Sequence, residues 1–96
     1  MKSLAVALID KGRIETSEAK AKSLRPMVEK MISRARRGDL SDRRILVSRL
    51  GSGHSADKLI RDVAPRYLKR LGGYTRIVKL PARLSDSSRR AIIEFV

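Results

Sequence analysis

The chain contains no cysteine and no tryptophan, and its three aromatic residues are two tyrosines and one phenylalanine. Without cysteine it forms no disulfide and no thiolate metal site, which fits a reducing compartment. Proteins that bind single-stranded nucleic acid use rows of stacking aromatic side chains, and three aromatics in 96 residues do not supply such a row. Asparagine and glutamine, which read adenine in DNA, are also missing.

Long apolar runs are missing as well. The apolar run at residues 4–9 follows Lys2 and faintly resembles a signal peptide, but it is only six residues long and Asp10 ends it. A first amphipathic helix is the better interpretation of this segment. No stretch approaches the roughly twenty apolar residues that cross a bilayer. We therefore expect a cytoplasmic protein with no membrane partner.

Residues that could carry out catalysis are scarce. His54 is the single histidine and lies between serine and glycine residues, where we interpret it as an exposed loop residue. The nearest carboxylate pairs lack the histidine or further carboxylate of a hydrolytic metal site. Residues 51–53 and 72–73 lack the spacing of a phosphate-binding loop. We predict that the protein is not an enzyme and that it has no catalytic or metal site, no cofactor and no small-molecule substrate.

Positive charge is what the chain has in excess. Lysine and arginine number 23 against 10 acidic residues, which gives a formal net charge of +13. Fifteen of the 23 are arginine, which binds phosphate in a bidentate way. Residues 1–48 contribute +6 and residues 49–96 contribute +7, so the field belongs to the folded body. A polyanionic partner best explains such self-repulsion; a basic protein without a specific partner is the plain alternative.

The first half of the chain predicts a helix, a short strand and a long helix. Gly12 is suited to end a first helix, because glycine adopts positive φ without a clash. Residues 13–16 alternate charged and uncharged side chains as a half-buried strand does. Ser17 is a suitable cap for a second helix at about 18–37, whose apolar residues recur every three or four positions. Pro26 lies inside this helix and predicts a kink or a restart.

The second half predicts two more helices and two strands. Ser41 is the expected cap of a third helix that ends at Gly51, and Ser55 is the expected cap of a fourth, which Pro65 bends or breaks. Residues 74–80 and 91–96 are rich in β-forming side chains, and the basic segment 81–90 joins them as a loop.

The predicted fold is therefore a single two-layer α/β domain over residues 1–96, with the order α-β-α-α-α-β-β. We expect the three strands to form one small mixed sheet. Apolar pairs at 77–78 and 92–93 point to both sides of that sheet, so helices are expected to cover both faces.

Three ordered parts of the sequence resemble one known family. Residues 12–16 read GRIET and residues 20–26 read KAKSLRP; APRY at 64–67 precedes GGYTRI at 72–77; and AIIE at 91–94 closes the chain. This pattern resembles the family of the seventeenth protein of the bacterial large ribosomal subunit. Family members carry a basic tail before the first helix, whereas Met1 falls inside the first helix expected here, so no role of that tail is expected from these residues.

The resemblance implies a two-layer α/β fold and a structural role in the large ribosomal subunit. It implies that the chain binds and stabilises folded ribosomal RNA near the outlet of the nascent-chain tunnel, beside other small basic ribosomal proteins. Arginine and lysine would act there by replacing counterions on clustered phosphates. Localisation would be cytoplasmic and ribosome-associated.

Basic side chains gather in several clusters, of which the one around Gly72 and Gly73 suggests the closest approach to RNA. There we expect Arg70 and Arg76 to contribute more to binding than Lys58 and Arg61, which we interpret as intrahelical ion pairs. Tyr67 is expected in the core, while Tyr74 is a candidate for base stacking. The candidate RNA-binding residues are Lys2, Arg13, Lys20, Lys22, Arg25, Arg34, Arg37, Arg43, Arg44, Arg66, Lys69, Arg70, Tyr74, Arg76, Arg83 and Arg89.

Two other binding modes are weaker alternatives. Helices starting at Asp42 and Ala56, joined by a short glycine-containing turn, superficially resemble a helix-turn-helix DNA-binding module. Against it, Asp57 and Asp62 would face the phosphates. A basic helix on an anionic membrane is disfavoured because the apolar helix faces are needed for the core.

Overall fold

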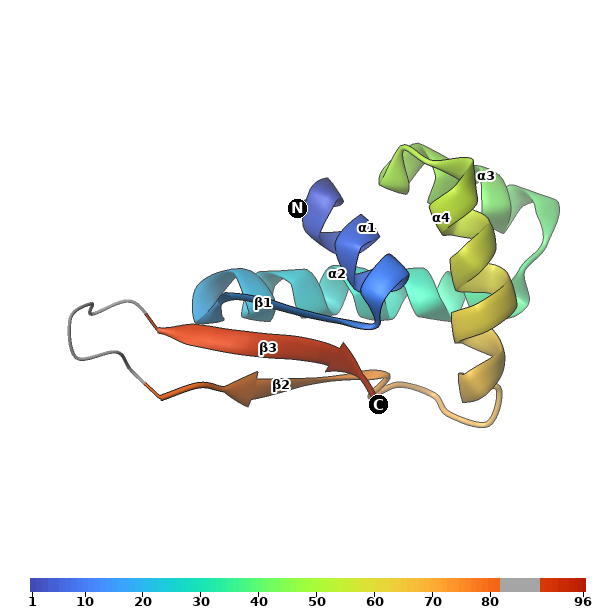
Figure 1. The fold of residues 1–96 in the computed structure, drawn as a ribbon. Coiled ribbons are helices and arrows are strands. Elements are labelled where there is room, and N and C mark those ends of the chain that lie inside the picture. Colours follow the sequence, from blue (N-terminus) through green and yellow to red (C-terminus); the bar gives the residue numbers. More distant parts are fainter. Residues whose placement is uncertain (82–88) are drawn as a thin grey trace.

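The computed structural model describes residues 1–81 and 89–96. Its elements follow the predicted order α-β-α-α-α-β-β, and the predicted α/β class is confirmed. Figure 1 shows the long helix α2 lying along the sheet, with α3 above the C-terminal end of α2 in this view. None of the helices in the described residues combines the length and the apolar character that a membrane crossing requires. The elements are α1 (Lys2–Lys11), β1 (Arg13–Ser17), α2 (Glu18–Arg37), α3 (Leu40–Leu50), α4 (Gly53–Lys58), β2 (Thr75–Lys79) and β3 (Arg90–Phe95).

Helix α2 begins and ends where the sequence predicts. The Oγ atom of Ser17 accepts a hydrogen bond of 3.2 Å from the backbone N–H of Lys20, and Gly38, at φ 60°, ends the helix. The helix continues through Pro26, so the predicted restart is wrong. One missing backbone donor is tolerated because packing of the apolar face, not local propensity, holds most helices. The buried residues of α2 are Ala21, Leu24, Val28, Met31, Ile32 and Ala35.

Helices α3 and α4 begin earlier than predicted. Asp39, not Ser41, caps α3, because its Oδ1 accepts a 2.8 Å hydrogen bond from the N–H of Asp42. Ser52, not Ser55, caps α4, and its Oγ accepts from the N–H of Ser55 at 3.2 Å. Serine and aspartate are equally good caps, so a run of them leaves the first residue of a helix ambiguous in the sequence.

Helix α4 changes its winding before it ends. It continues as a π-helical turn, Leu59–Val63, and then as a 3-10 turn, Ala64–Tyr67. Pro65 lies at the start of the 3-10 turn, where the missing proline N–H interrupts regular α-helical bonding as predicted. Tyr67 is buried, which confirms it as a core residue, and its hydroxyl donates a 2.8 Å hydrogen bond to the carbonyl of Val96.

The three strands form one sheet in the order β1-β3-β2. Both neighbouring pairs are antiparallel, with Ile93 opposite Ile14 on one side and opposite Ile77 on the other. The expectation of a mixed sheet is therefore wrong, because both strand pairs are antiparallel. Successive side chains point to opposite faces in parallel and antiparallel strands alike, so the side-chain period of these short strands does not fix their relative direction.

In the described part of the chain, helices cover only one face of this sheet, so the expectation of cover on both faces is wrong. Ile93 is fully buried on the face toward α2. On the other side, Val78 is 43% exposed and lies opposite Ile92, with charged residues at the neighbouring positions of this face. A mixture of charged and branched side chains lets an antiparallel sheet face water. We call this side the open face; from the register its residues are Arg13, Glu15, Arg76, Val78, Arg90, Ile92 and Glu94.

Candidate nucleic-acid interface

The arginines of the open face are held by carboxylates. Glu94 lies between two of them, 2.7 Å from Nε of Arg76 and 3.8 Å from Nε of Arg13. The hydrogen bond from Arg76 is the main cause that lowers the pKa of Glu94. Arg90 pairs with Glu15 at 3.3 Å. Arg13 and Arg76, both candidate RNA ligands, therefore come together here, but around a carboxylate that already cancels one of their two positive charges.

The start of α2 combines paired and unpaired cations. Glu18 accepts from Lys22 at 3.0 Å and also pairs with Lys79 at 3.4 Å. The hydrogen bond from Lys22 is the largest cause of the lowered pKa of Glu18. Lys20 and Arg25 are exposed and have no carboxylate partner among the described residues. They are the two cations of this cluster that can meet an anion without first leaving an ion pair.

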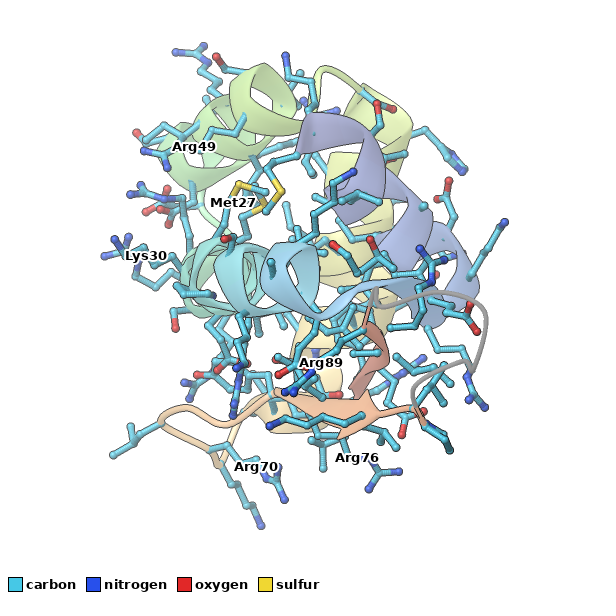
Figure 2. All side chains as sticks on the ribbon, turned by 90° about the vertical axis from the view of Figure 1, so that its left-hand side faces the viewer. Met27, Lys30, Arg49, Arg70, Arg76 and Arg89 are labelled. Atoms are coloured by element: carbon cyan, nitrogen blue, oxygen red, sulfur yellow. The ribbon has the colours of Figure 1, made fainter. Side chains whose placement is uncertain are left out.

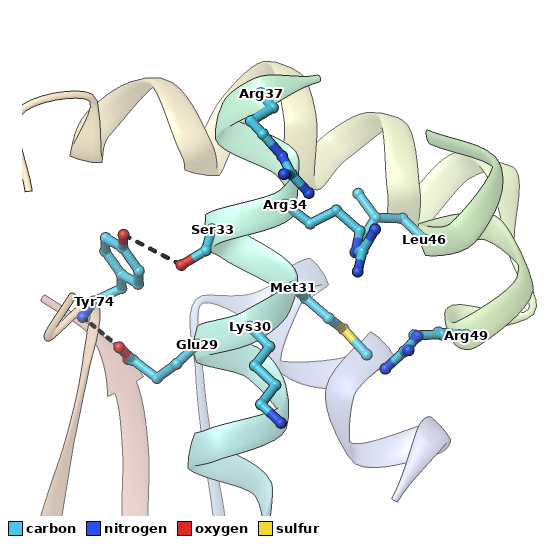
Figure 3. Close-up of a pocket in the computed structure, with 9 residues that line it drawn as sticks. All are labelled: Glu29, Lys30, Met31, Ser33, Arg34, Arg37, Leu46, Arg49 and Tyr74. Atoms are coloured by element: carbon cyan, nitrogen blue, oxygen red, sulfur yellow. Dashed lines mark hydrogen bonds between the residues drawn. The ribbon is translucent and has the colours of Figure 1, made fainter. Parts of the chain in front are cut away.

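A second group of cations lines a shallow groove across α2 and α3. Its volume is about 570 Å³, and Figure 3 shows Lys30 and Arg34 on α2 with Arg49 facing them from α3. Figure 2 shows Lys30 and Arg49 projecting on the same side of the molecule. Within residues 1–81 and 89–96, neither of these two cations is paired with a carboxylate. We call this site the helical groove; its cations are Lys30, Arg34, Arg37 and Arg49.

One buried carboxylate holds two of the groove arginines. Oδ1 of Asp42 accepts from Arg37 at 3.0 Å and from Arg34 at 3.4 Å. Asp42 is only 3% exposed, and its Oδ2 is buried without a hydrogen-bond partner in the described residues. Asp42 thus fixes the directions of Arg34 and Arg37 while cancelling one of the four positive charges of the groove.

Arg43, another candidate RNA ligand, has a structural role in this fold. It donates from Nε and Nη2 to the two oxygens of Asp57, at 2.8 and 3.2 Å, and so ties α3 to α4. The pair raises the pKa of Arg43 and lowers the pKa of Asp57, in each case mainly through the side-chain hydrogen bond. Lys58 donates a hydrogen bond to the backbone carbonyl of Asp10. It therefore does not form the intrahelical ion pair that the sequence predicted.

The double-glycine segment is anchored to α2 by Glu29. One carboxylate oxygen accepts from the N–H groups of Gly73 and Tyr74, at 3.0 and 3.1 Å. The other accepts from the N–H and the hydroxyl of Thr75, at 2.9 and 2.8 Å. Four hydrogen bonds to one charged group hold the chain strongly as it enters β2. We call residues 66–73 the basic turn; its cations are Arg66, Lys69 and Arg70.

Tyr74 is fully buried, so the prediction that it stacks on a base is wrong. Its ring packs on Tyr67 with centroids 5.2 Å apart. Arg36, which the sequence did not single out, donates to the Tyr74 hydroxyl and to the carbonyl of Leu68, both at 2.8 Å. No feature of the sequence separates Arg36 from its basic neighbours in α2, because the atoms it binds are more than thirty residues away.

The other candidate residues are dispersed. Lys2 lies against Gly51 at the end of α3. Arg44 is exposed on α3, and Arg89 lies at the start of α2, where its carbonyl accepts from the N–H of Glu18 at 3.0 Å. Arg83 lies outside the described residues. Lys2, Arg44 and Arg89 thus belong neither to the helical groove nor to the basic turn.

His54 is exposed as predicted, although it lies in α4 and not in a loop. It shares a surface hollow with Asp57, Lys58, Arg61 and Asp62. In residues 1–81 and 89–96, no three histidine, aspartate or glutamate side chains come close enough together to hold a metal ion.

The fold and these surfaces define a small, strongly basic α/β domain whose cations are unevenly compensated by carboxylates. Comparison with known proteins is more specific. The whole chain, residues 1–96, matches the family described as Ribosomal protein L17, and the chain belongs to that family. The resemblance noted in the sequence is therefore confirmed.

Three relatives, each named large ribosomal subunit protein bL17, illustrate the similarity. The protein of a Hydrogenobaculum species is 54% identical over 97 residues, which cover 100% of this chain and 82% of the relative. That of Neorickettsia sennetsu is 50% identical, covering 98% and 81%. That of Campylobacter jejuni is 44% identical, covering 100% and 82%. Members of this family are structural, ribosome-associated components of the bacterial cytoplasm and not enzymes, as predicted.

Proposed function

We propose that the chain binds and stabilises folded ribosomal RNA of the large subunit through the helical groove and the basic turn. One observation carries this proposal: among the described residues, these two regions hold exposed cations without carboxylate partners, whereas the open face does not. Phosphates brought together by RNA folding repel one another, and an arginine or lysine that replaces their counterions stabilises that fold.

Most of the contacts should be made with the sugar-phosphate backbone and should depend on the shape of the RNA. Both tyrosines are buried, and Phe95 is partly buried against the core, so none of the three aromatics forms a stacking platform. Folded RNA, with its irregular backbone and crowded phosphates, is the partner that suits a rigid basic surface without aromatic readers.

The helix-turn-helix alternative gains no support. The supposed recognition helix, α4, has only six regular α-helical residues, Gly53–Lys58. Asp57 lies in it and holds Arg43, a cation that a DNA phosphate would require.

We also propose that the chain lies near the outlet of the nascent-chain tunnel, next to other small basic ribosomal proteins, as the family resemblance implies. The open face is the side suited to a protein neighbour, because its arginines are compensated and Val78 is 43% exposed. A photo-crosslinking amino acid at Val78 in assembled subunits should then capture protein, while the same probe at Arg49 should capture RNA. RNA at both positions would refute the assignment of the open face.

The proposed RNA binding is tested by a salt titration. The purified chain is mixed with large-subunit ribosomal RNA, and the dissociation constant is measured between 50 and 200 mM salt. If about six phosphates are neutralised, affinity should fall roughly a thousandfold across this range. Affinity that barely changes with salt, or that is equal for unrelated DNA of the same length, would reject the proposal.

A further inference from the structure

The tip of the basic turn presents two leucines to solvent. Leu71 is 96% exposed and Leu68 is 62% exposed. Single exposed leucines are common on protein surfaces, but these two belong to one short turn that projects beside β2. Their neighbours in the turn are Lys69 and Arg70, so an apolar tip is combined with a cationic rim.

The backbone that carries these leucines is held at both ends. Arg36 donates a 2.8 Å hydrogen bond to the carbonyl of Leu68, and the N–H of Arg70 donates to the carbonyl of Tyr67 at 2.9 Å. The hydroxyl of Tyr74 donates to the carbonyl of Arg70 at 3.3 Å.

On the far side of the tip, Arg70 Nη1 donates to the carbonyl of Gly73 at 3.0 Å, and Glu29 accepts from the Gly73 N–H at 3.0 Å. A turn fixed by five such contacts loses little backbone freedom when a partner arrives. The leucines are thus presented in advance in one arrangement.

We propose that Leu68 and Leu71 form an apolar knob that packs on exposed base faces at a loop, bulge or helix end of folded ribosomal RNA. This rests on the proposed function and specifies how the basic turn meets its RNA. At irregular sites of folded RNA the apolar faces of unstacked bases are accessible, and proteins insert leucine-like wedges beside bases in other nucleic-acid complexes.

Charge favours RNA over a protein pocket as the occupant. Residues 64–76 include four basic residues and no acidic one. The carboxylate of Glu29 reaches this segment, but its two oxygens are occupied by Gly73, Tyr74 and Thr75. A polyanion gains from the cationic rim around the knob, whereas an apolar pocket on another basic protein would be repelled by it.

The test compares exposed leucines in different surroundings. The double variant Leu68→Ser/Leu71→Ser is measured against Leu40→Ser, because Leu40 is 63% exposed at the start of α3, away from the turn. The single variant Leu71→Ser guards against a folding defect, and thermal melting of each variant is recorded. Each is titrated with large-subunit ribosomal RNA at several salt concentrations.

The double variant should bind about tenfold more weakly at every salt concentration, since apolar contact area is lost. Its salt slope should equal that of the wild type, because no charge changes; Arg70→Gln should instead lower the slope by about one. Chemical probing should show one or a few nucleotides whose base reactivity changes with the wild type and with Leu40→Ser, but not with the double variant.

If the double variant binds the RNA as tightly as the wild type and changes base reactivity in the same way, the proposal that the two leucines pack on bases is wrong. The leucines would then be available to contact a protein neighbour. A wild-type chain that shows no salt-dependent binding to the ribosomal RNA would instead defeat the proposed function itself. The two failures are therefore distinguished by the wild-type titration.

Discussion

The open face and the helical groove are both rich in basic side chains, but carboxylates pair with these side chains to different extents. Each arginine of the open face meets a carboxylate, whereas only two of the four groove cations do so in the described residues. On the sheet, Arg76 lies directly opposite Glu94 in the register, and a carboxylate meets each arginine. On the helix, Lys30, Arg34 and Arg37 follow one another at steps of four and three residues. Like charges at these spacings destabilise an isolated helix, which is a cost that an anionic partner can offset.

The contrast shows that the number of cations is a poor guide to where an anion binds. Glu15, Glu18 and Glu94 all compensate cations of the sheet or its edge. In the groove, Asp42 pairs with Arg34 and Arg37, whereas Lys30 and Arg49 have no carboxylate partner among the described residues. Carboxylates therefore compensate the cations of the sheet more fully than those of the groove, and more positive charge remains uncompensated in the groove.

The largest expected effect concerns the contact that holds the basic turn. Replacement of Glu29 by alanine removes four hydrogen bonds to the chain around β2. It should lower the free energy of unfolding by about 3 kcal/mol, because charged, partly buried hydrogen bonds are costly to lose. Urea unfolding measures this. Glu15→Ala, which breaks an exposed ion pair on the open face, should cost less than about 1 kcal/mol. Similar losses for the two variants would contradict the anchoring role of Glu29.

The next effect separates compensated from uncompensated cations. Lys30→Gln/Arg49→Gln and Arg13→Gln/Arg76→Gln both remove two positive charges. The first pair should reduce the slope of log affinity against log salt by about two, since each phosphate contact contributes about 0.9. The second pair should leave the slope nearly unchanged, because Glu94 already occupies those arginines. Equal changes in slope would mean that only total charge matters.

The smallest effect is the acid sensitivity of the open face. Arg76 lowers the pKa of Glu94 in the folded state, so their interaction stabilises the fold fully above the unfolded glutamate pKa of about 4.3. This contribution is lost as the pH falls through the lower folded pKa. The stability difference between the wild type and Arg76→Gln should therefore shrink between pH 7 and pH 3. Arg70 pairs with no carboxylate in the described residues, so the stability difference between the wild type and Arg70→Gln should be the same at both pH values. If the difference for Arg76→Gln is also the same at both pH values, the pairing of Arg76 with Glu94 does not contribute to stability.

Much of the fold was predictable because the signals are local. Ser17 and Gly38 mark the ends of α2 within the sequence itself, and the apolar steps between them define its buried face. The order of the seven elements followed from such local patterns. The family could be recognised because its motifs are short segments in a fixed order along the chain, and their recognition does not require the tertiary structure.

The candidate site was predicted less well because its properties depend on distant partners. Arg13 is compensated by Glu94, which lies at the other end of the chain. Arg49 joins Lys30 in one groove only because α3 folds back against α2. Tyr74 looked available to RNA until packing on Tyr67 buried it.

The sequence by itself determined the sign and the strength of the field, the type and order of the helices and strands, and the family, since each depends on residue types and their spacing along the chain. The tertiary structure alone decided which cations remain available. That outcome depends on which carboxylates the antiparallel register and the helix packing bring within hydrogen-bonding distance, and on the burial of a side chain such as Tyr74. Neither the register nor the burial is a property of any one segment, because both arise only when separate elements pack together.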